Sequence, residues 1–387
     1  MSDATALLLV LIALYASDCV TFLHAHSTAF VSFAGAQFRI RLPSVLFGNR
    51  KGGLALLNPL PPLGTIHVAQ PLPVSIGPRA VVAYISQSLT RAGRPRQAGT
   101  VYEYAGLESV TAQGRDVHVN HSRFVRCRTG HIATKLAALL DALRGLDEAG
   151  RASALRAHLT ATLDTQALAA RRRRFETATR PLRVMCNVLW FYLFAACPLI
   201  VARFGFSWLL APLAATGLAI HVAALCLFVR AHRRLLPASG TERVEHVVKM
   251  ALCPPMLIRA VDAVAADLLD AFHPLALALV LCEPQAGRTY TEQFVRDLAF
   301  PVPDEPHTVV AEQTIDWFRN CSLEVLAEFL TRHQIVVSEI LEPPADAVPE
   351  HRSYCPRCHG LYTVAEGECV DCFGVALRAL PEADPKP

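Results

Sequence analysis

The sequence predicts an α+β integral membrane protein that is built around a transmembrane helical hairpin. Two apolar runs of 19 and 22 residues, 184–202 and 208–229, are joined by only five residues. A helix needs about 20 apolar residues to cross the hydrocarbon core of a bilayer, so the hairpin 184–229 has a very short turn. Hydrophobic residues make up 52% of the chain and its mean hydropathy is +0.32, both high for a soluble protein.

A first apolar segment lies at the N-terminus, over residues 4–16. A signal peptide carries basic residues before its apolar core, whereas the only charge here is Asp3. We therefore predict an uncleaved membrane anchor over residues 1–23. Asp18 is expected at the membrane interface, where a carboxylate costs far less than at the bilayer centre. The alternative is a helix buried in a soluble core.

The region between this anchor and the hairpin, 24–183, is basic and is predicted to be cytoplasmic. Short alternating segments within 30–46, 65–69 and 117–127 predict strands, whereas 131–143 has helical periodicity. Strands followed by a helix favour a small β-rich domain that a helix closes. Ala- and Arg-rich helix then continues to the four arginines 171–174.

After the hairpin we predict a mainly helical cytoplasmic region, 230–340, in which Cys253-Pro254-Pro255 interrupts one helical pattern. A Pro-rich linker, 341–353, leads to a cysteine-rich segment, 354–376, and a tail, 377–387.

Basic residues near the two runs predict the orientation of the hairpin. Nine arginines flank its outer ends, at 171–174, 180, 183, 230, 233 and 234, whereas the turn contains only Arg203. Cytoplasmic loops carry the excess of Lys and Arg, so both large regions are predicted to be cytoplasmic. Only four of the 37 basic residues are Lys, a composition typical of a GC-rich bacterial genome, so the bilayer is predicted to be a bacterial inner membrane.

The charge changes sign across the hairpin. Residues 1–235 carry 26 basic and 10 acidic residues, a net charge of +16, whereas residues 283–387 carry 8 and 18, a net charge of −10. We expect the acidic region to dock against the basic one and the contact to loosen as salt rises. The arginine clusters suit anionic lipid headgroups better than nucleic acid, which is an unlikely partner.

Four of the twelve cysteines form two C-x-x-C pairs: Cys355 with Cys358, and Cys369 with Cys372. Each pair continues as C-x-x-C-x-G, through Gly360 and Gly374, and glycine relieves the positive φ that such a turn can demand. Zinc takes four ligands in a tetrahedron, and two facing turns of this kind supply four thiolates. The other eight cysteines are scattered singly, which fits a reducing compartment.

This segment resembles the rubredoxin-type zinc ribbon, over Cys355 to Gly374 only. The resemblance implies a structural zinc ion, since four protein ligands leave no open coordination position. Iron in the same sulfur cage is an alternative, and a dithiol redox pair is a weaker one. His359 could replace a cysteine ligand or be a hydrated surface side chain. Glu366, Glu368 and Asp371 lie beside the ligands and would repel phosphate.

No catalytic or cofactor-binding residues are predicted, because the chain has no phosphate-binding, nucleophile-elbow or metalloprotease motif. His221, in the second apolar run, is either a functional group or a neutral imidazole hydrogen-bonded to the partner helix, with Asn187 as the suggested partner. Small residues at Ala211, Ala215 and Gly217 suit close helix packing, within the hairpin or in an oligomer.

The function predicted from these features is a membrane-anchored scaffold or regulatory adaptor with a structural zinc ribbon. Its expected partners are the lipid bilayer and a second protein or further copies of this chain. The alternative is a membrane-bound enzyme of unrecognised class with a structural zinc site. A transporter is a weaker interpretation, because three spans enclose little membrane volume.

Overall fold

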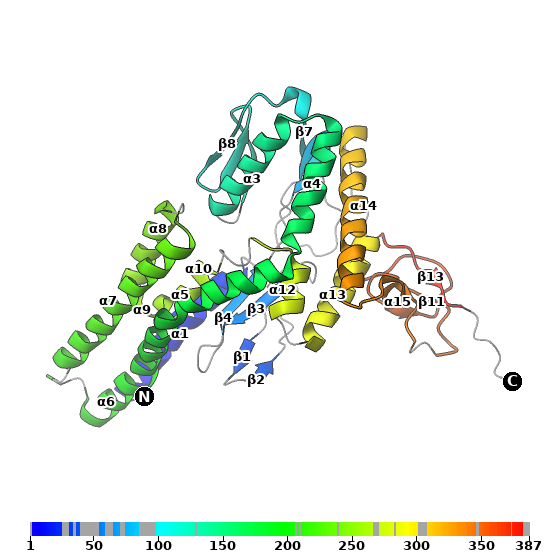
Figure 1. Ribbon diagram of the computed structural model, residues 1–387. Coiled ribbons are helices and arrows are strands. Elements are labelled where there is room, and N and C mark those ends of the chain that lie inside the picture. Colours follow the sequence, from blue (N-terminus) through cyan, green and yellow to red (C-terminus); the bar gives the residue numbers. More distant parts are fainter. Residues whose placement is uncertain are drawn as a thin grey trace. The chain divides into compact units, whose positions relative to one another are not determined.

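The computed structural model describes residues 2–24, 31–33, 36–38, 54–58, 65–69, 74–84, 98–127, 130–205, 207–208, 210–237, 240–265, 271–281, 284–300, 308–345, 348–372 and 374–381. The chain forms two compact units (Figure 1). The hairpin unit comprises Met1–Gln70, Arg128–Ile132 and Thr165–Pro274. The ribbon unit comprises Pro71–Cys127, Ala133–Asp164 and Leu275–Pro387.

The hairpin unit is built on two long helices that are long and apolar enough to cross a membrane, Thr165–Phe204 and Leu210–Leu235. The first is divided into α5 (Thr165–Phe191), a π-helical turn η2 (Tyr192–Ala196) and α6 (Cys197–Phe204), and the second is α7 (Leu210–Leu235). The π-helical turn directly precedes Pro198, which has no N–H to offer the helical ladder. The predicted apolar hairpin is thus confirmed as a pair of helices.

Close packing holds the hairpin together at Gly217. The hydroxyl of Tyr192 donates a hydrogen bond to the backbone oxygen of Leu213. A Cβ at position 217 would come within 2.9 Å of the Tyr192 ring, so only glycine permits this approach. The expectation for Gly217 therefore holds within the hairpin, whereas Ala211 and Ala215 are exposed.

The N-terminal apolar run is helix α1 (Asp3–His24). Tyr15 is buried and lies edge-to-face against Phe194, with ring centroids 5.9 Å apart, so α1 packs on η2 and α6. The side chain of Asp18 lies outside the described residues, and its position at the membrane interface stays a prediction.

In the described residues after the hairpin lie the short helices α8 (Gly240–Leu252), α9 (Pro254–Leu257) and α10 (Ala260–Val264). The chain leaves α8 at Cys253-Pro254-Pro255, as the prolines predict. Four strands complete this unit as two antiparallel pairs: β1 (Val31–Phe33) with β2 (Ala36–Phe38), and β3 (Leu54–Asn58) with β4 (Thr65–Ala69). The rest of the predicted strand segment 30–46 lies outside the described residues.

The ribbon unit contains three small antiparallel sheets. The first has the order β5 (Val74–Ile76), β6 (Ala80–Tyr84), β7 (Ala98–Glu103), and β7 leads into a 3-10 turn, η1 (Tyr104–Gly106). The second has the order β10 (Ser122–Arg126), β9 (Asp116–Val119), β8 (Val110–Gln113). The third has the order β12 (Leu361–Tyr362), β11 (Ser353–Tyr354), β13 (Arg378–Ala379). The predicted succession of short strands before a helix, 131–143, agrees with β5–β10 and α3 (Gly130–Arg144).

The other described elements of the ribbon unit are helices. They are α4 (Glu148–Thr162), α12 (Pro274–Leu281), α13 (Pro284–Ala299), α14 (Val309–Arg332) and α15 (Val337–Leu341). Side-chain caps begin two of them: Asp147 accepts from the Gly150 N–H at 2.8 Å, and Thr308 accepts from the Ala311 N–H at 3.1 Å.

Chain segments from both sides of the hairpin meet in this unit. Helix α14 packs on β5, β6 and α4, and Val82 and Ala311 are fully buried where sheet and helix touch. At the rim of this contact, Arg156 of α4 pairs with Glu324 at 2.8 Å and Glu328 at 3.0 Å, and all three side chains are exposed. The expected contact between the basic and acidic regions thus exists, but its core is apolar. Its ion pairs are exposed to solvent and therefore contribute little stability.

The two units do not follow the chain order of the predicted segments. Residues 24–183 and 230–340, which the sequence suggested as single regions, each contribute to both units. The largest segment of the hairpin unit, Thr165–Pro274, lies in the sequence between two segments of the ribbon unit, Ala133–Asp164 and Leu275–Pro387.

Candidate metal centre

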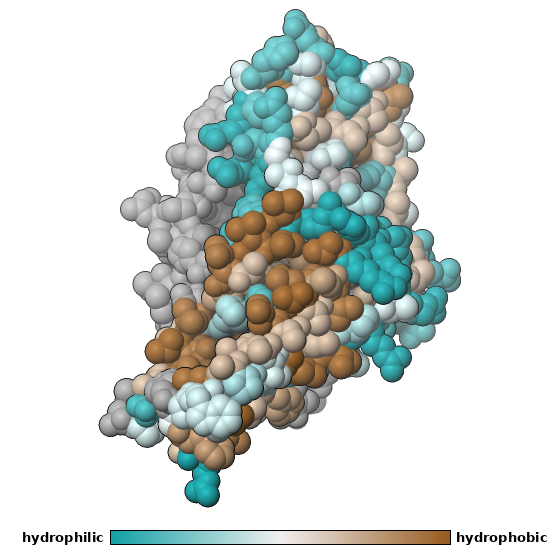
Figure 2. All heavy atoms as spheres, turned by 90° about the vertical axis from the view of Figure 1, so that its left-hand side faces the viewer, coloured by the Kyte–Doolittle hydropathy of each residue, from teal (hydrophilic) through white to brown (hydrophobic). Residues whose placement is uncertain are grey.

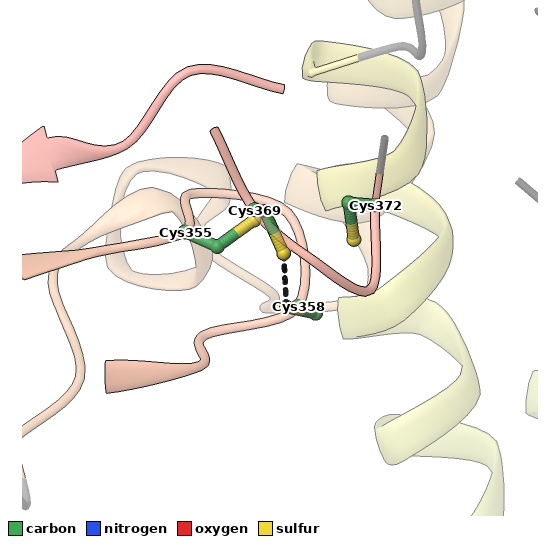
Figure 3. A group of neighbouring side chains, drawn as sticks. All are labelled: Cys355, Cys358, Cys369 and Cys372. Atoms are coloured by element: carbon green, nitrogen blue, oxygen red, sulfur yellow. Dashed lines mark hydrogen bonds between the residues drawn. The ribbon is translucent and has the colours of Figure 1, made fainter. Parts of the chain in front are cut away.

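The four predicted cysteines come together at one end of the ribbon unit (Figure 3). Their Sγ atoms all lie within 4.8 Å of one another, and those of Cys358 and Cys369 are 3.6 Å apart. A tetrahedral zinc ion with Zn–S bonds of about 2.3 Å needs sulfur–sulfur edges of about 3.8 Å. Three of the thiols are buried and Cys358 is half-buried. The cluster therefore has the size and seclusion of a site for one four-coordinate metal ion.

Tight backbone turns aim the four sulfurs inward. In the first loop, between β11 and β12, the Cys355 N–H donates to Gly360 O and the His359 N–H donates to Cys355 O, both at 2.9 Å. In the second loop, the Cys369 N–H donates to Val375 O at 2.9 Å.

Positive φ angles occur at His359 (60°) and Gly374 (73°). Glycine therefore takes the left-handed position in the second loop, as the repeated C-x-x-C-x-G predicts, but His359 takes it in the first. A Cβ at Gly360 would lie 3.4 Å from the Cys358 sulfur, close to an ordinary van der Waals contact, so the structure does not require glycine at this position.

The thiols of the cluster differ in pKa. Hydrogen bonds from Cys358 and Cys372 lower the pKa of Cys355 to about 4, whereas hydrogen bonds to Cys355 and Cys358, and then burial, raise the pKa of Cys372. Complete deprotonation would gather four negative charges within 4.8 Å, which is tolerable only around a cation. The donor set thus fits a metal ion that is soft enough to prefer thiolates.

Tyr362 supports the cluster from outside. Its hydroxyl donates to the Cys369 sulfur at 3.1 Å, and such a bond orients a ligand and stabilises its thiolate. The ring of His359 lies edge-to-face against Tyr354, with centroids 6.1 Å apart. Cysteine spacing alone could not identify Tyr362 as a neighbour of the cluster.

A buried ion pair fixes the first loop to helix α13. Nε of Arg357, between Cys355 and Cys358 in sequence, lies 2.6 Å from Oδ1 of Asp297, and the two side chains are only 7% and 18% exposed. Gln293 donates to the same Asp297 oxygen at 3.0 Å. Farther along, the Arg378 guanidinium lies 4.5 Å from the centre of the Phe300 ring. The ribbon is therefore part of a larger packed unit.

Outside this cluster, the described part of the chain holds no other group of three or more side chains arranged for a metal ion. His221 is buried in the hairpin unit. Among the described residues, Oδ1 of Asn187 has no hydrogen-bond partner. The suggested hydrogen bond between these two residues is therefore absent.

Comparison with known proteins gives no match: no family model, no curated protein and no solved structure resembles this chain. The functional argument consequently rests on the residues and geometry described above.

Proposed function

We propose that this protein is a membrane-anchored cytoplasmic scaffold or regulatory adaptor whose ribbon is folded around a structural zinc ion. The four-cysteine cluster carries the proposal. Four protein thiolates fill a tetrahedral zinc ion, so no position is left for water or substrate. Zinc is favoured over iron because it suits sulfur donors without redox chemistry, and iron is the alternative occupant to test.

The tethering of the ribbon supports a structural role. Zinc binding to a four-cysteine cage contributes roughly 10–16 kcal/mol at neutral pH. The strands around it, β11 to β13, have only two residues each, so they contribute little stability of their own. In this proposal the metal keeps the loop containing Arg357 in the shape that docks on α13, and the ribbon offers a rigid surface to a partner.

Metal content tests the site directly. Freshly purified protein should hold about one equivalent of zinc, and Cys355→Ser should lose it and make residues beyond 341 sensitive to protease. Cys321→Ser is the matched control, because Cys321 lies on α14 outside the cluster. Less than about half an equivalent of zinc in the wild-type protein, or one equivalent of iron, would reject the structural zinc proposal.

The composition of the ribbon unit supports the proposed topology. Its sequence comes from residues before the hairpin, 71–164, and after it, 275–387. A compact unit lies on one side of a bilayer, so an even number of crossings must separate these two segments. Helices α5–α6 and α7 supply two crossings, and the nine flanking arginines favour the cytoplasm for the unit. The bacterial inner membrane is the corresponding compartment.

A reporter enzyme that is active only outside the cytoplasm tests this topology. Fused after Pro387, it should be silent, whereas fused within the turn between α6 and α7 it should be active. Activity of the fusion after Pro387 would reverse the proposed orientation.

An enzyme remains the second candidate, because the ribbon unit contains a cavity of about 550 Å³. Arg288, Glu292 and Arg296 of α13 line it together with His359, and the Arg296 Nε is buried with no hydrogen-bond partner among the described residues. Protein extracted in mild detergent separates the two functions. A stoichiometric protein partner favours the adaptor, and a tightly bound small molecule favours the enzyme.

A further inference from the structure

On the cytoplasmic side, the two apolar runs of the hairpin end at different levels. Tyr192 lies against Leu213 and Gly217, and the Arg174 guanidinium donates to Arg234 O at 2.9 Å. These contacts place residue 184, where the first apolar run begins, opposite about residue 223. The last half-dozen residues of the second run, up to Val229, therefore extend beyond the first run.

Helix α8 covers this extension. The ring centroid of His246 lies 6.3 Å from that of Phe228 and 6.5 Å from that of His232, and His221 lies beside the backbone of Ala251. Helix α8 therefore runs antiparallel to α7, and its last turn reaches the level of His221. The Cys186 thiol donates to Leu257 O at 3.3 Å, so the chain just after α8 is level with the cytoplasmic edge of the first run.

The exposed face of α8 carries an apolar stripe, with the charged residues Glu245 and Lys249 at one edge of it. Val244, Val248 and Leu252 are 61%, 51% and 81% exposed, whereas Met250 on the other side is buried. A spacing of four residues turns a helix by only about 40°, so these three side chains form one stripe. A helix on a water-facing surface carries its charged residues there. In α8 the charged pair Glu245 and Lys249, with Oε1 and Nζ 2.6 Å apart, lies beside the stripe.

We propose that this outward stripe of α8 lies in the cytoplasmic leaflet of the bilayer, with Leu252 at the boundary between headgroups and hydrocarbon. The proposal rests on the membrane role proposed above. It commits to lipid because α7, on which α8 packs, also exposes apolar side chains, including Leu218 and Val222. Figure 2 looks onto the side of the molecule where α7 and α8 lie, and hydrophobic residues gather there.

The sequence of α8 suits a helix whose residues lie progressively deeper in the leaflet from its first turn to its last. At about 1.5 Å per residue, Val244 lies about 12 Å nearer to water than Leu252. Lys249 is one turn shallower than Cys253, so its ammonium can reach lipid phosphates while its stem stays in the leaflet. Pro254 and Pro255 follow at the deepest point. They have no N–H, so the turn leaves fewer donors to satisfy where water is scarce.

Spin labels measure this depth. Single cysteines replace Val244, Val248 or Leu252 in zinc-loaded protein in which Cys19, Cys226, Cys253, Cys282 and Cys321 are serine. The protein is placed in nanodiscs of phosphatidylcholine and phosphatidylglycerol. Collision with oxygen, which concentrates in lipid, is compared with collision with a water-soluble nickel chelate. Leu218 on α7 is the lipid reference, and Val364, an exposed residue of the ribbon, is the aqueous reference.

The oxygen-to-nickel ratio should rise from Val244 through Val248 to Leu252, and at Leu252 it should approach that at Leu218. A ratio at Val248 and Leu252 equal to that at Val364 would place the stripe in water and overturn the proposal. Exclusion of both reagents would mean that protein covers the stripe, for instance a second copy, and would overturn it as well. If Leu218 itself gives the aqueous ratio, α7 does not lie in the bilayer, and the result rejects the proposed membrane role as a whole. A label at Ala251, also exposed, replaces that at Leu252 if the zinc content falls.

Discussion

The ion pair between Asp297 and Arg357 offers a sharp test of how the ribbon is held. In Asp297→Asn the side chain keeps its shape but loses its charge, while the Arg357 guanidinium stays buried. Among the described residues, Nη1 of Arg357 is already buried without a hydrogen-bond partner, so the guanidinium has no second acceptor to replace the lost carboxylate. We expect the ribbon to separate from α13 far more often in this variant.

The magnitude follows from the burial of the pair. Removing one partner of a buried ion pair costs about 3–5 kcal/mol, and because Asp297 is 18% exposed we expect about 3 kcal/mol. That corresponds to roughly a 150-fold increase in the population of the separated state. Asp316→Asn is the matched control. Asp316 pairs with Arg319 on α14 at 2.9 Å, but their side chains are 52% and 26% exposed, so we expect a loss of at most about 0.5 kcal/mol.

Hydrogen exchange measures the separation. Peptides covering residues 293–300 and 352–360 should exchange roughly 100-fold faster in Asp297→Asn than in the wild-type protein, with zinc still bound. The double variant Asp297→Leu with Arg357→Met should recover most of the protection, because it leaves no buried charge. If Asp297→Asn exchanges no faster than Asp316→Asn, the ion pair does not hold the ribbon and the reasoning fails.

Two further changes test other contacts. Tyr362→Phe should weaken zinc binding about 10-fold in a chelator competition, because the hydroxyl bond to Cys369 is lost; an unchanged affinity contradicts this role. Thr308→Ala should cost about 1 kcal/mol in urea unfolding by removing the cap of α14, while Thr331→Ala, within the same helix, should cost less.

The features predicted best from the sequence are those that depend on residues close together in the sequence. The length of an apolar run determines whether one helix can cross a bilayer, and the four cysteines lie within 18 residues of one another. Asp297 was not identified, because it lies 60 residues before Arg357 among many other acidic residues. Nothing in the local pattern distinguishes it. The membrane orientation, the identity of the metal and the adaptor function stay predictions.

The charge difference predicted that the regions on either side of the hairpin would be in contact. Charge is only part of the reason for this contact. The sequence argument relied on +16 facing −10, and it implied a contact that salt weakens. The structure instead buries Val82 against Ala311 and leaves Arg156, Glu324 and Glu328 at the exposed rim. Exposed pairs contribute at most about 1 kcal/mol each, so high salt should cost this contact little.

The contact has a consequence for assembly. Strands β5 to β7 and helix α14 are separated in sequence by the whole hairpin, so their contact closes a loop of some 200 residues. Loop-closure entropy grows only slowly with length, by about 0.6 kcal/mol for each doubling, so the insertion of residues 165–274 costs the ribbon unit little. The proposed membrane topology adds a geometric condition that is stricter than the entropic one. If the two long helices cross a bilayer as proposed, both must insert before α14 can reach its sheet, because a single crossing would leave the two segments on opposite sides of the membrane.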